Sequence, residues 1–382
     1  MTRLTIGING GGIGGLAAAI ALRQAGHDVQ VYEQAASYNR IGADINLTPN
    51  AVRALDGLGV VPALKETAAR PTHRISRMWD TGEETSRLEM ADTAEQKYGA
   101  PQLTIHRADL LDALRRQLPE DIVHLCHRVA AIDVTGKRPK LRFTSGKEVE
   151  VDVLVGADGI HSLTRTALFG PEHPEFTGLV SYRAVIDRCR LDLPNLDAFT
   201  KWWGPTADLQ IVTFPLNKGR ETFVFATTAQ PDWREESWTM PGDVNELRAA
   251  YANFHPEARA LLDACDSVTK SALYVRDPLP VWSVGRVTLL GDACHPMVPF
   301  MAQGACMAIE DAVVLGRALR DVDSEHVGPA LKRYEDARKV RTARVQIGSR
   351  GNEWLKQGGN ADWVYAFDAW SAPLAPHTES VA

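Results

Sequence analysis

A glycine-rich turn near the start of the chain is the feature that most restricts what this sequence can fold into. Gly10, Gly12 and Gly15 follow the apolar run Leu4–Asn9 and precede the Ala-rich stretch Leu16–Ala25. The order of strand, turn and helix is the pattern of a dinucleotide-binding turn, in which glycines allow a tight bend and a close approach of the backbone to a pyrophosphate. The helix that follows offers free N–H groups and a partial positive charge to the phosphates.

An acidic residue follows at the distance that this kind of turn predicts. The run Val29–Tyr32 has the composition of a second strand and is followed by Glu33, 18 residues after Gly15. That spacing suits a carboxylate that binds a ribose hydroxyl. The alternative is an ordinary glycine-rich turn with Glu33 exposed at a strand end, but the agreement of strand, glycines, helix and acid favours a nucleotide site. Because glycines interrupt the apolar run, we do not expect a secretion signal.

Two later segments repeat the pattern of a strand that leads into an acidic turn. Val151–Val155 precedes the turn Gly156–Gly159, which contains Asp158, and Val287–Leu290 precedes Gly291-Asp292. A carboxylate at a strand end can accept a hydrogen bond from a sugar hydroxyl, although either turn alone would be common in any protein. Together with the first turn, they predict a nucleotide site assembled from distant parts of the chain.

His295 follows the third of these turns and is a candidate catalytic residue. No second catalytic group lies at a fixed spacing from it, which weakens a catalytic interpretation. The interpretation that we favour is that His295 orders the loop before Pro296. Both roles stay open at this point.

Composition excludes several classes of protein. The chain has 382 residues, which suggests two or three domains, and its 42 Lys and Arg against 48 Asp and Glu give a formal net charge of −6. This balance lacks the basic character of a nucleic-acid-binding protein. No apolar run is long enough to cross a membrane. The five scattered cysteines have no metal-ligand spacing and predict neither a metal site nor a disulfide framework, so we expect a cytoplasmic protein.

Taken together, these segments resemble the class A flavoprotein aromatic hydroxylases, the family of p-hydroxybenzoate hydroxylase and salicylate hydroxylase. The likeness covers almost the whole chain, and the matching residues are Gly10–Gly15 with Glu33, His106–Leu110, Gly156–Gly159 and Gly291-Asp292. The chain is most similar to the 6-hydroxynicotinate 3-monooxygenase branch, through the runs Gly291–Met297, Met301–Asp311 and Lys201–Trp203.

The resemblance implies an α/β fold of mixed α+β character, in which a β-sheet substrate domain interleaves with a Rossmann-like FAD-binding domain, as in p-hydroxybenzoate hydroxylase. We expect the FAD-binding domain at 1–70, 98–175 and 268–345, and the substrate domain at 71–97 and 176–267. Strand composition at Gly178–Ile186, Phe199–Trp203, Leu209–Pro215 and Thr222–Thr227 agrees with a sheet there.

The C-terminal segment 346–382 is rich in aromatic residues, and we expect it to be helical. Its aromatic side chains favour packing on the body of the protein, and the alternative is a tail that binds a partner.

The resemblance also implies which residues would hold FAD. Gly10, Gly12, Gly14 and Gly15 would hold the pyrophosphate, and Arg107 would contact the phosphates. Glu33 with Gln34 would bind the adenosine ribose, and Val129 would lie on the adenine side. Asp292 would bind the ribityl or pyrophosphate region, and Gly304 with Ala305 would lie beside the isoalloxazine. Asp158 would serve FAD and NADH or NADPH together.

The substrate pocket is where the likeness becomes weaker. By resemblance, Asn46, Gln210 and Phe300 occupy places where the 6-hydroxynicotinate branch has histidine, and Phe214 occupies the place of a tyrosine. Strand periodicity puts Gln210, Val212 and Phe214 on one face, which the resemblance directs at the substrate. We therefore expect a substrate other than 6-hydroxynicotinate itself. For Gln210 and Phe214, simple filling of the core is the alternative.

A general base is missing from this set of residues. Family members commonly deprotonate a phenol, and a base within hydrogen-bond reach helps that step. Either the substrate is already electron-rich or acidic, or a base comes from Tyr182, Arg183, Asp208 or His295. Arg183 could instead hold a carboxylate, and the amides of Asn46 and Gln210 can hold a hydroxyl, a ring nitrogen or a carboxylate without titrating.

The activity implied is that of an NAD(P)H- and O2-dependent FAD monooxygenase. It would hydroxylate a small hydroxylated aromatic or N-heteroaromatic acid through a flavin C4a-hydroperoxide, and the protein would be a monomer or homodimer. Two alternatives remain: a flavin oxidase or epoxidase that acts on a larger natural product, and an FAD-binding protein without catalysis.

Overall fold

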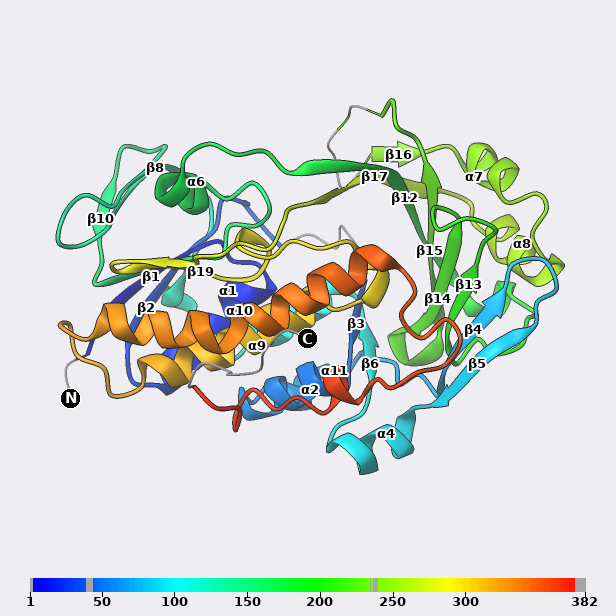
Figure 1. The fold of residues 1–382 in the computed structure, drawn as a ribbon, viewed down its shortest axis with the longest axis horizontal. Coiled ribbons are helices and arrows are strands. Elements are labelled where there is room, and N and C mark those ends of the chain that lie inside the picture. Colours follow the sequence, from blue (N-terminus) through cyan, green and yellow to red (C-terminus); the bar gives the residue numbers. More distant parts are fainter. Residues whose placement is uncertain (1–2, 39–43, 234, 236–239, 375–382) are drawn as a thin grey trace.

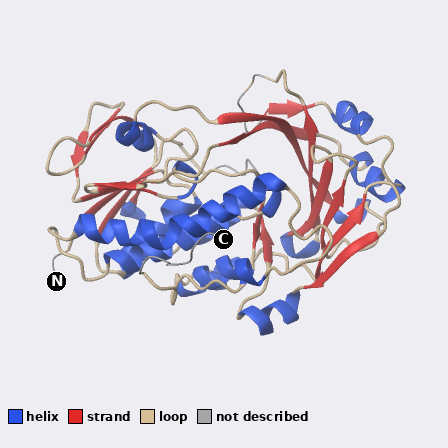
Figure 2. Cartoon of the chain, in the orientation of Figure 1, coloured by secondary structure: helices blue, strands red, loops and turns tan. Residues whose placement is uncertain are grey.

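Two large sheets at opposite ends of the long axis organise the computed structural model, which describes residues 3–38, 44–233, 235 and 240–374. Helices gather around the first sheet and run between the two, as the colouring by secondary structure in Figure 2 shows. Within the described residues, no helix combines the length and the apolar character that crossing a lipid bilayer requires.

The first sheet has six strands, and its core is parallel. In spatial order the strands are β18 (Ser283–Val284), β19 (Val287–Leu289), β11 (Val153–Gly156), β1 (Thr5–Asn9), β2 (Asp28–Tyr32) and β7 (Val123–His124). Only β18 and β19 pair in the antiparallel sense. The central strands carry β-branched residues such as Ile8, Val31 and Val155, all fully buried. Such apolar runs form because both faces of this sheet are buried. Helices pack on one face, and Leu141 and Phe143 of a small antiparallel sheet pack on the other.

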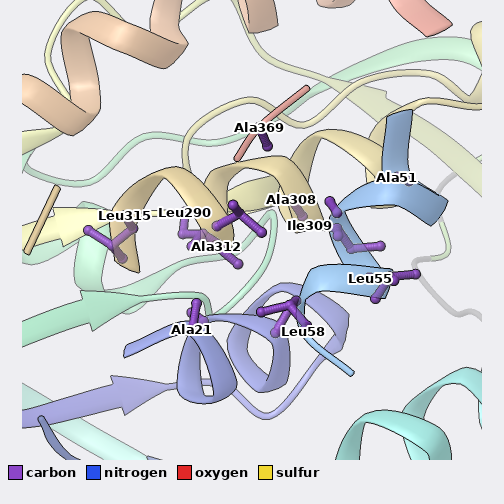
Figure 3. Close-up of a cluster of buried hydrophobic side chains, with 14 of the residues drawn as sticks. Ala21, Ala51, Leu55, Leu58, Leu290, Ala308, Ile309, Ala312, Leu315 and Ala369 are labelled. Atoms are coloured by element: carbon purple, nitrogen blue, oxygen red, sulfur yellow. The ribbon is translucent and has the colours of Figure 1, made fainter. Parts of the chain in front are cut away.

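Helices from distant parts of the chain cover this sheet. They are α1 (Ile13–Gln24), α2 (Pro49–Gly57), α5 (Arg107–Arg115), α9 (Gly304–Leu319) and α10 (Val327–Gly351). Figure 3 shows α9 placing Ala308, Ile309 and Ala312 among side chains of neighbouring helices. A Cβ on Gly316 of α9 would come within 2.8 Å of the Ala21 side chain of α1, so the small residue permits this close helix contact.

The second sheet has eight strands and stands at the other end of the molecule (Figure 1). In spatial order they are β16 (Met240–Gly242), β17 (Val268–Val275), β12 (Glu175–Asp187), β15 (Glu221–Ala229), β14 (Gln210–Leu216), β13 (Phe199–Trp203), β4 (His73–Met78) and β5 (Glu84–Glu89). The four strands predicted between residues 178 and 227 are confirmed as β12, β13, β14 and β15.

The two faces of the eight-stranded sheet have different surroundings. On one face, helices α7 (Val244–Ala250) and α8 (Pro256–Asp263) pack on a cluster that contains Trp202, Ile211 and Tyr251. The other face, called the inner face below, carries an aromatic cluster that also includes Phe300. Phe300 lies just before α9, so the inner face looks toward the helices of the first sheet.

Two small sheets and short helices complete the fold. They are the pair β3 (Ile45–Leu47) and β6 (Leu103–Ile105), the three strands β8 (Val129–Asp133), β9 (Lys140–Phe143) and β10 (Glu148–Glu150), and the helices α3 (Val61–Leu64), α4 (Ala91–Tyr98), α6 (Leu163–Phe169) and α11 (Asp362–Tyr365). The pair β3 and β6 joins the large sheets, because Thr104 Oγ1 donates to the Pro215 carbonyl of β14 at 2.5 Å.

The fold class predicted from the sequence is confirmed. The division of the chain into an FAD-binding and a substrate domain stays a prediction. One strand lies differently from that division: β17 starts at Val268, the predicted return to the FAD-binding domain, yet it pairs with β12 in the eight-stranded sheet. Its ladder of hydrogen bonds continues the antiparallel sheet until Val275.

The C-terminal segment packs on the body as expected, but it is mostly irregular rather than helical. Its first residues belong to α10, and only α11 follows. Trp354, Trp363, Phe367 and Trp370 contact the main core. Arg53 of α2 donates to the carbonyl of Phe367 at 2.6 Å. Irregular backbone is tolerated here because side chains elsewhere in the chain satisfy its carbonyls. Residues 375–382 lie outside the described residues.

Two acidic residues of α9 and two arginines of α10 form a buried network. Arg338 Nη1 lies 2.7 Å from Glu310 Oε2, and its Nε donates to Asp311 Oδ1 at 2.7 Å. Arg341 also pairs with Glu310, at 2.9 Å. Burial alone would raise the pKa of Glu310, but the two guanidinium groups outweigh burial and keep that pKa below its usual value. The network therefore ties α9 to α10 with ionised groups.

Replacing Arg338 with Met should strongly destabilise the protein. The variant leaves two buried carboxylates without their shared cation, a change that typically costs about 3–5 kcal/mol. The matched control is Arg344→Met on the same helix, where an exposed guanidinium covers the Trp363 ring at 4.1 Å and about 0.5–1 kcal/mol is at stake. Urea unfolding measures both free energies, and equal losses would contradict the role given to the network.

Candidate active site

The turns after β1 and β11 lie against each other at the edge of the six-stranded sheet. Gly10 has φ +109°, and a Cβ on it would lie 2.3 Å from the Ala157 carbonyl oxygen. A Cβ on Gly15 would lie 2.0 Å from the carbonyl oxygen of Gly10. Both positions therefore require glycine, because no side chain fits without moving the backbone.

Asp158 holds these two turns together. Its carboxylate accepts hydrogen bonds from Asn9 Nδ2 at 2.8 Å, Ser162 Oγ at 2.5 Å and Thr164 N at 2.9 Å. A fourth bond comes from the Thr164 hydroxyl. Three of these bonds end on Oδ2 and one on Oδ1, so Oδ1 keeps capacity for one more donor. The geometry shows a positioning role for Asp158, and its direct contact with a cofactor stays a prediction.

The first turn opens into a hollow of about 190 Å³. It is lined by Gly11, Gly12, Glu33, Ala35, Ser37, Tyr38 and Arg107. A Cβ on Gly12 would meet no atom within 4 Å, so the backbone there faces open space. Helix α1 begins beside it with no side chain bonded to its first N–H groups and no acid in its first turn. Such a terminus is suited to a phosphate.

Charged side chains surround this hollow. Glu33 Oε2 accepts from the N–H of Gly11 at 2.7 Å. Burial lowers the pKa of Arg107, while nearby Glu33 and Asp292 act in the opposite direction. Asp292 is accessible from one side although protein crowds it on the others, and this crowding raises the pKa of its carboxyl. The structure thus brings together the glycines, Glu33, Arg107 and Asp292 from four parts of the sequence.

The other residues predicted to bind FAD lie around the same region. Gly304 and Ala305 are half-buried in the first turn of α9, a second helix start with no acidic residue. Gly14 approaches Leu290 and Ala308 closely, so it serves the packing of α1. Val129 packs at the edge of the cluster that contains Tyr32, and Gln34 is exposed after Glu33. The roles of all these residues toward FAD stay predictions.

His295 has the surroundings of a structural residue. It is buried, its Nε2 lies 2.5 Å from Asp311 Oδ2, and its ring lies 5.4 Å from that of Trp282. Cys294, His295 and Asp311 are the one group among the described residues with metal-ligand proximity, within 4.8 Å. Arg338 and the N–H of Gly291 already occupy the Asp311 carboxylate. These contacts support the loop-ordering role.

The predicted alternation of β14 is confirmed. Phe214 and Val212 lie in the inner-face cluster with Phe300, whereas Ile211 lies in the cluster under α7 and α8. The Phe214 ring stacks on Phe199 with centroids 5.5 Å apart. Because Phe300 belongs to the segment that leads into α9, this aromatic cluster lies between the eight-stranded sheet and a predicted flavin-binding segment.

The two candidate amides have polar atoms without partners. Gln210 is 1% exposed, and neither its Oε1 nor its Nε2 has a hydrogen-bond partner among the described residues. Asn46 Oδ1 accepts from Gln102 Nε2 at 2.5 Å, but its own Nδ2 is likewise buried without a partner. Such groups cost free energy unless something binds them. Each of the two amides therefore keeps hydrogen-bonding capacity for a further polar group.

Of the four residues considered in connection with a base, Arg183 lies on the inner face. It lies 5.6 Å from the Phe225 ring, and burial lowers its pKa to about 10 while Asp44 acts in the opposite direction. Asp208 is half-buried in the turn before β14, where its backbone carbonyl accepts from Thr227 Oγ1. The Tyr182 hydroxyl lies on the opposite face, where it accepts from Gln230. Neither Tyr182 nor the buried His295 is placed to act on a ligand at the inner face.

Sequence reasoning missed two buried cations on the inner face. Lys201 of β13 lies with its Nζ 3.7 Å from the centre of the Trp203 ring. Arg74 of β4 lies over Phe199 and Trp354, at 4.6 and 4.8 Å. The available signal was a lysine inside the otherwise apolar run Phe199–Trp203. A charged residue in a buried strand is uncommon and indicates a specific partner.

Comparison with known proteins agrees with this geometry. A family model described as an FAD binding domain matches residues 3–347. The 6-hydroxynicotinate 3-monooxygenase of Bordetella bronchiseptica is 38% identical to this chain, and the match covers 99% of this chain and 98% of that protein. The chain belongs to the FAD-dependent aromatic hydroxylases.

Other members of this family give the same result. The 3-hydroxybenzoate 6-hydroxylase of Polaromonas naphthalenivorans is 36% identical, over 96% of this chain and 92% of that protein. A solved salicylate hydroxylase substrate complex superposes with a TM-score of 0.83 at 26% identity and covers 96% of each chain. The open turn at Gly12 and the uncapped start of α1 fit the pyrophosphate of FAD.

Replacing Arg107 with Met should weaken FAD binding by about 10- to 100-fold, the effect of losing one charge-assisted hydrogen bond of about 1.5–3 kcal/mol. Arg115→Met is the matched control, because Arg115 is exposed on the same helix, α5. Quenching of FAD fluorescence on titration gives both dissociation constants. An unchanged constant for Arg107→Met would contradict the placement of the phosphates beside this residue.

Proposed function

We propose that this protein uses NADH or NADPH and O2 to hydroxylate a small aromatic or pyridine ring that carries a hydroxyl and a carboxylate. The observation that carries the proposal is the aromatic cluster of Val212, Phe214 and Phe300 beside the unpartnered amide of Gln210. An apolar slot with a few polar groups at its edge is the usual form of a site for a flat ligand. The named relatives act on hydroxynicotinate, hydroxybenzoate and salicylate, which supports this class.

The protein's own side chains would bind and orient the substrate. FAD, when bound, supplies the redox chemistry with NAD(P)H and O2. Phe214 and Phe300 would hold the ring between the inner face and α9 and keep water out. Asn46 and Gln210 would bind a hydroxyl or a ring nitrogen, since an amide can both donate and accept a hydrogen bond.

The amides also bear on which substrate fits. Neither Asn46 nor Gln210 titrates, so neither can remove a proton from a phenol. We therefore infer that the ring is already electron-rich or acidic, and that it differs from 6-hydroxynicotinate. A monomer or homodimer is expected.

Purified protein loaded with FAD should oxidise NADH or NADPH faster when the correct acid is present. A panel of hydroxybenzoates, aminohydroxybenzoates and hydroxypyridine carboxylates tests this, with absorbance at the nicotinamide band as the rate and mass spectrometry for a product heavier by one oxygen. The control is each acid with the protein free of FAD.

Other outcomes would overturn the proposal. Oxygen uptake with no need for NAD(P)H would indicate an oxidase. Bound FAD that neither nicotinamide reduces, with any acid in the panel, would indicate a flavin-binding protein without this catalysis.

A further inference from the structure

Lys201 is a buried cation without an anionic partner among the described residues. Its side chain lies in the middle of β13 and the residue is 4% exposed. Its Nζ donates to Asn352 Oδ1 at 2.6 Å, a neutral acceptor. No carboxylate of the described chain lies within ion-pair distance of it. An ammonium group has three donors, so this one has capacity left for a ligand.

Other buried cations in this fold do have carboxylate partners. Arg338 pairs with two carboxylates, Lys270 lies 3.0 Å from Glu246, and Arg165 lies 2.7 Å from Glu172. Burying a charge without such a partner is costly. Burial, together with the nearby cations Arg74 and Lys356, lowers the pKa of Lys201 well below its usual value, although the Glu353 carboxylate acts in the opposite direction. Positive charge therefore outweighs negative charge in this corner of the inner face.

Two further donors lie on the same face of the sheet. Trp203 pairs with Gln210 across the ladder between β13 and β14, and Lys201 pairs with Val212. The indole N–H of Trp203 and the amide of Gln210 are both buried without a partner among the described residues. An ammonium group beside neutral N–H donors matches a carboxylate, whose oxygens only accept hydrogen bonds.

The aromatic cluster of the inner face lies directly beside these donors. Lys201 Nζ lies 5.6 Å from the centre of the Phe300 ring, and Phe300 packs with Val212 and Phe214. A ring held in this cluster could therefore direct a carboxylate substituent at Lys201. Arg183, also on the inner face, is a weaker candidate, because the carboxylate of Asp44 already influences it.

We propose that Lys201, with the N–H groups of Gln210 and Trp203, forms the subsite that holds the carboxylate of the aromatic substrate. The inference rests on the proposed function and adds the residue that selects acids over neutral analogues. Lys201 is then a substrate-anchoring residue, and Asn352 fixes its Nζ in place.

The test compares acids with their neutral amides. The FAD-loaded protein is titrated with 4-hydroxybenzoate and 4-hydroxybenzamide, and with salicylate and salicylamide, while the perturbation of the flavin absorbance spectrum is followed. We expect the unsubstituted protein to bind an acid about 10- to 100-fold more tightly than its amide. Lys201→Met should lose that preference and bind the amide with unchanged affinity.

Two further variants separate anchoring from folding. If Lys201→Met does not fold, Lys201→Gln replaces it in the test. This variant keeps a hydrogen-bond donor toward Asn352 but has no charge, and it should also lose the preference for the acid. Lys270→Gln is the matched control, a buried lysine on the opposite face of the same sheet, and should keep the preference.

The possible failures are distinguishable. If the unsubstituted protein binds none of the acids, binds acid and amide equally, or if Lys201 variants weaken both ligands equally, the carboxylate subsite is wrong. Hydroxylation of an acid would still support the proposed function in that case. Loss of acid preference in Lys201→Met, with no ligand-stimulated NAD(P)H oxidation, would support the subsite and overturn the function.

Discussion

The close approach of two backbone turns, after β1 and after β11, is the constraint on which the cofactor end of this molecule depends. Gly10 and Ala157 come within a distance that excludes any side chain, and Asn9 bonds to Asp158 across the same gap. This contact fixes where α1 begins and where its free N–H groups point. Glu33 and Arg107 line the space in front of that helix end, and Asp292 is close enough to Arg107 to influence its pKa. The six-stranded sheet brings Glu33 and Asp292 to this edge, because they follow β2 and β19, whereas Arg107 arrives at the start of α5.

Buried cations occur in two different surroundings in this protein, with carboxylate partners and without them. Between α9 and α10, each buried arginine has its carboxylates, and the helices are joined as a unit. On the inner face of the eight-stranded sheet, Lys201 and Arg74 have aromatic rings and neutral oxygens instead. An unpaired buried charge is costly, and this cost is the physical basis of the carboxylate subsite proposed at Lys201.

Local patterns made much of this architecture predictable. The glycine spacing at Gly10–Gly15 and the apolar runs around it correctly give β1, the turn and α1, because each depends on neighbours in sequence. The period of a strand correctly places Val212 and Phe214 on one face. These features need no knowledge of the rest of the fold.

Contacts between distant residues could not be predicted in the same way. The residues near Lys201 in sequence do not predict that Asn352, 151 residues later, accepts its hydrogen bond. The hydrogen bond from Asn9 to the Asp158 carboxylate, and the irregular course of the aromatic C-terminal segment, also follow from packing between remote segments. The fold brings the glycines, Glu33 and Arg107 together, while the partners of Lys201 and Asp158 became visible only in three dimensions.

The path of the chain between the two large sheets has a consequence for how such an enzyme can acquire new substrates. The chain enters the eight-stranded sheet once for β4 and β5 and again for β12 through β17, and it returns to the first sheet each time. Replacing one continuous stretch of sequence could therefore not exchange the whole eight-stranded sheet for another. Changes in that sheet must then accumulate as individual replacements along its strands, and not as the exchange of a whole unit.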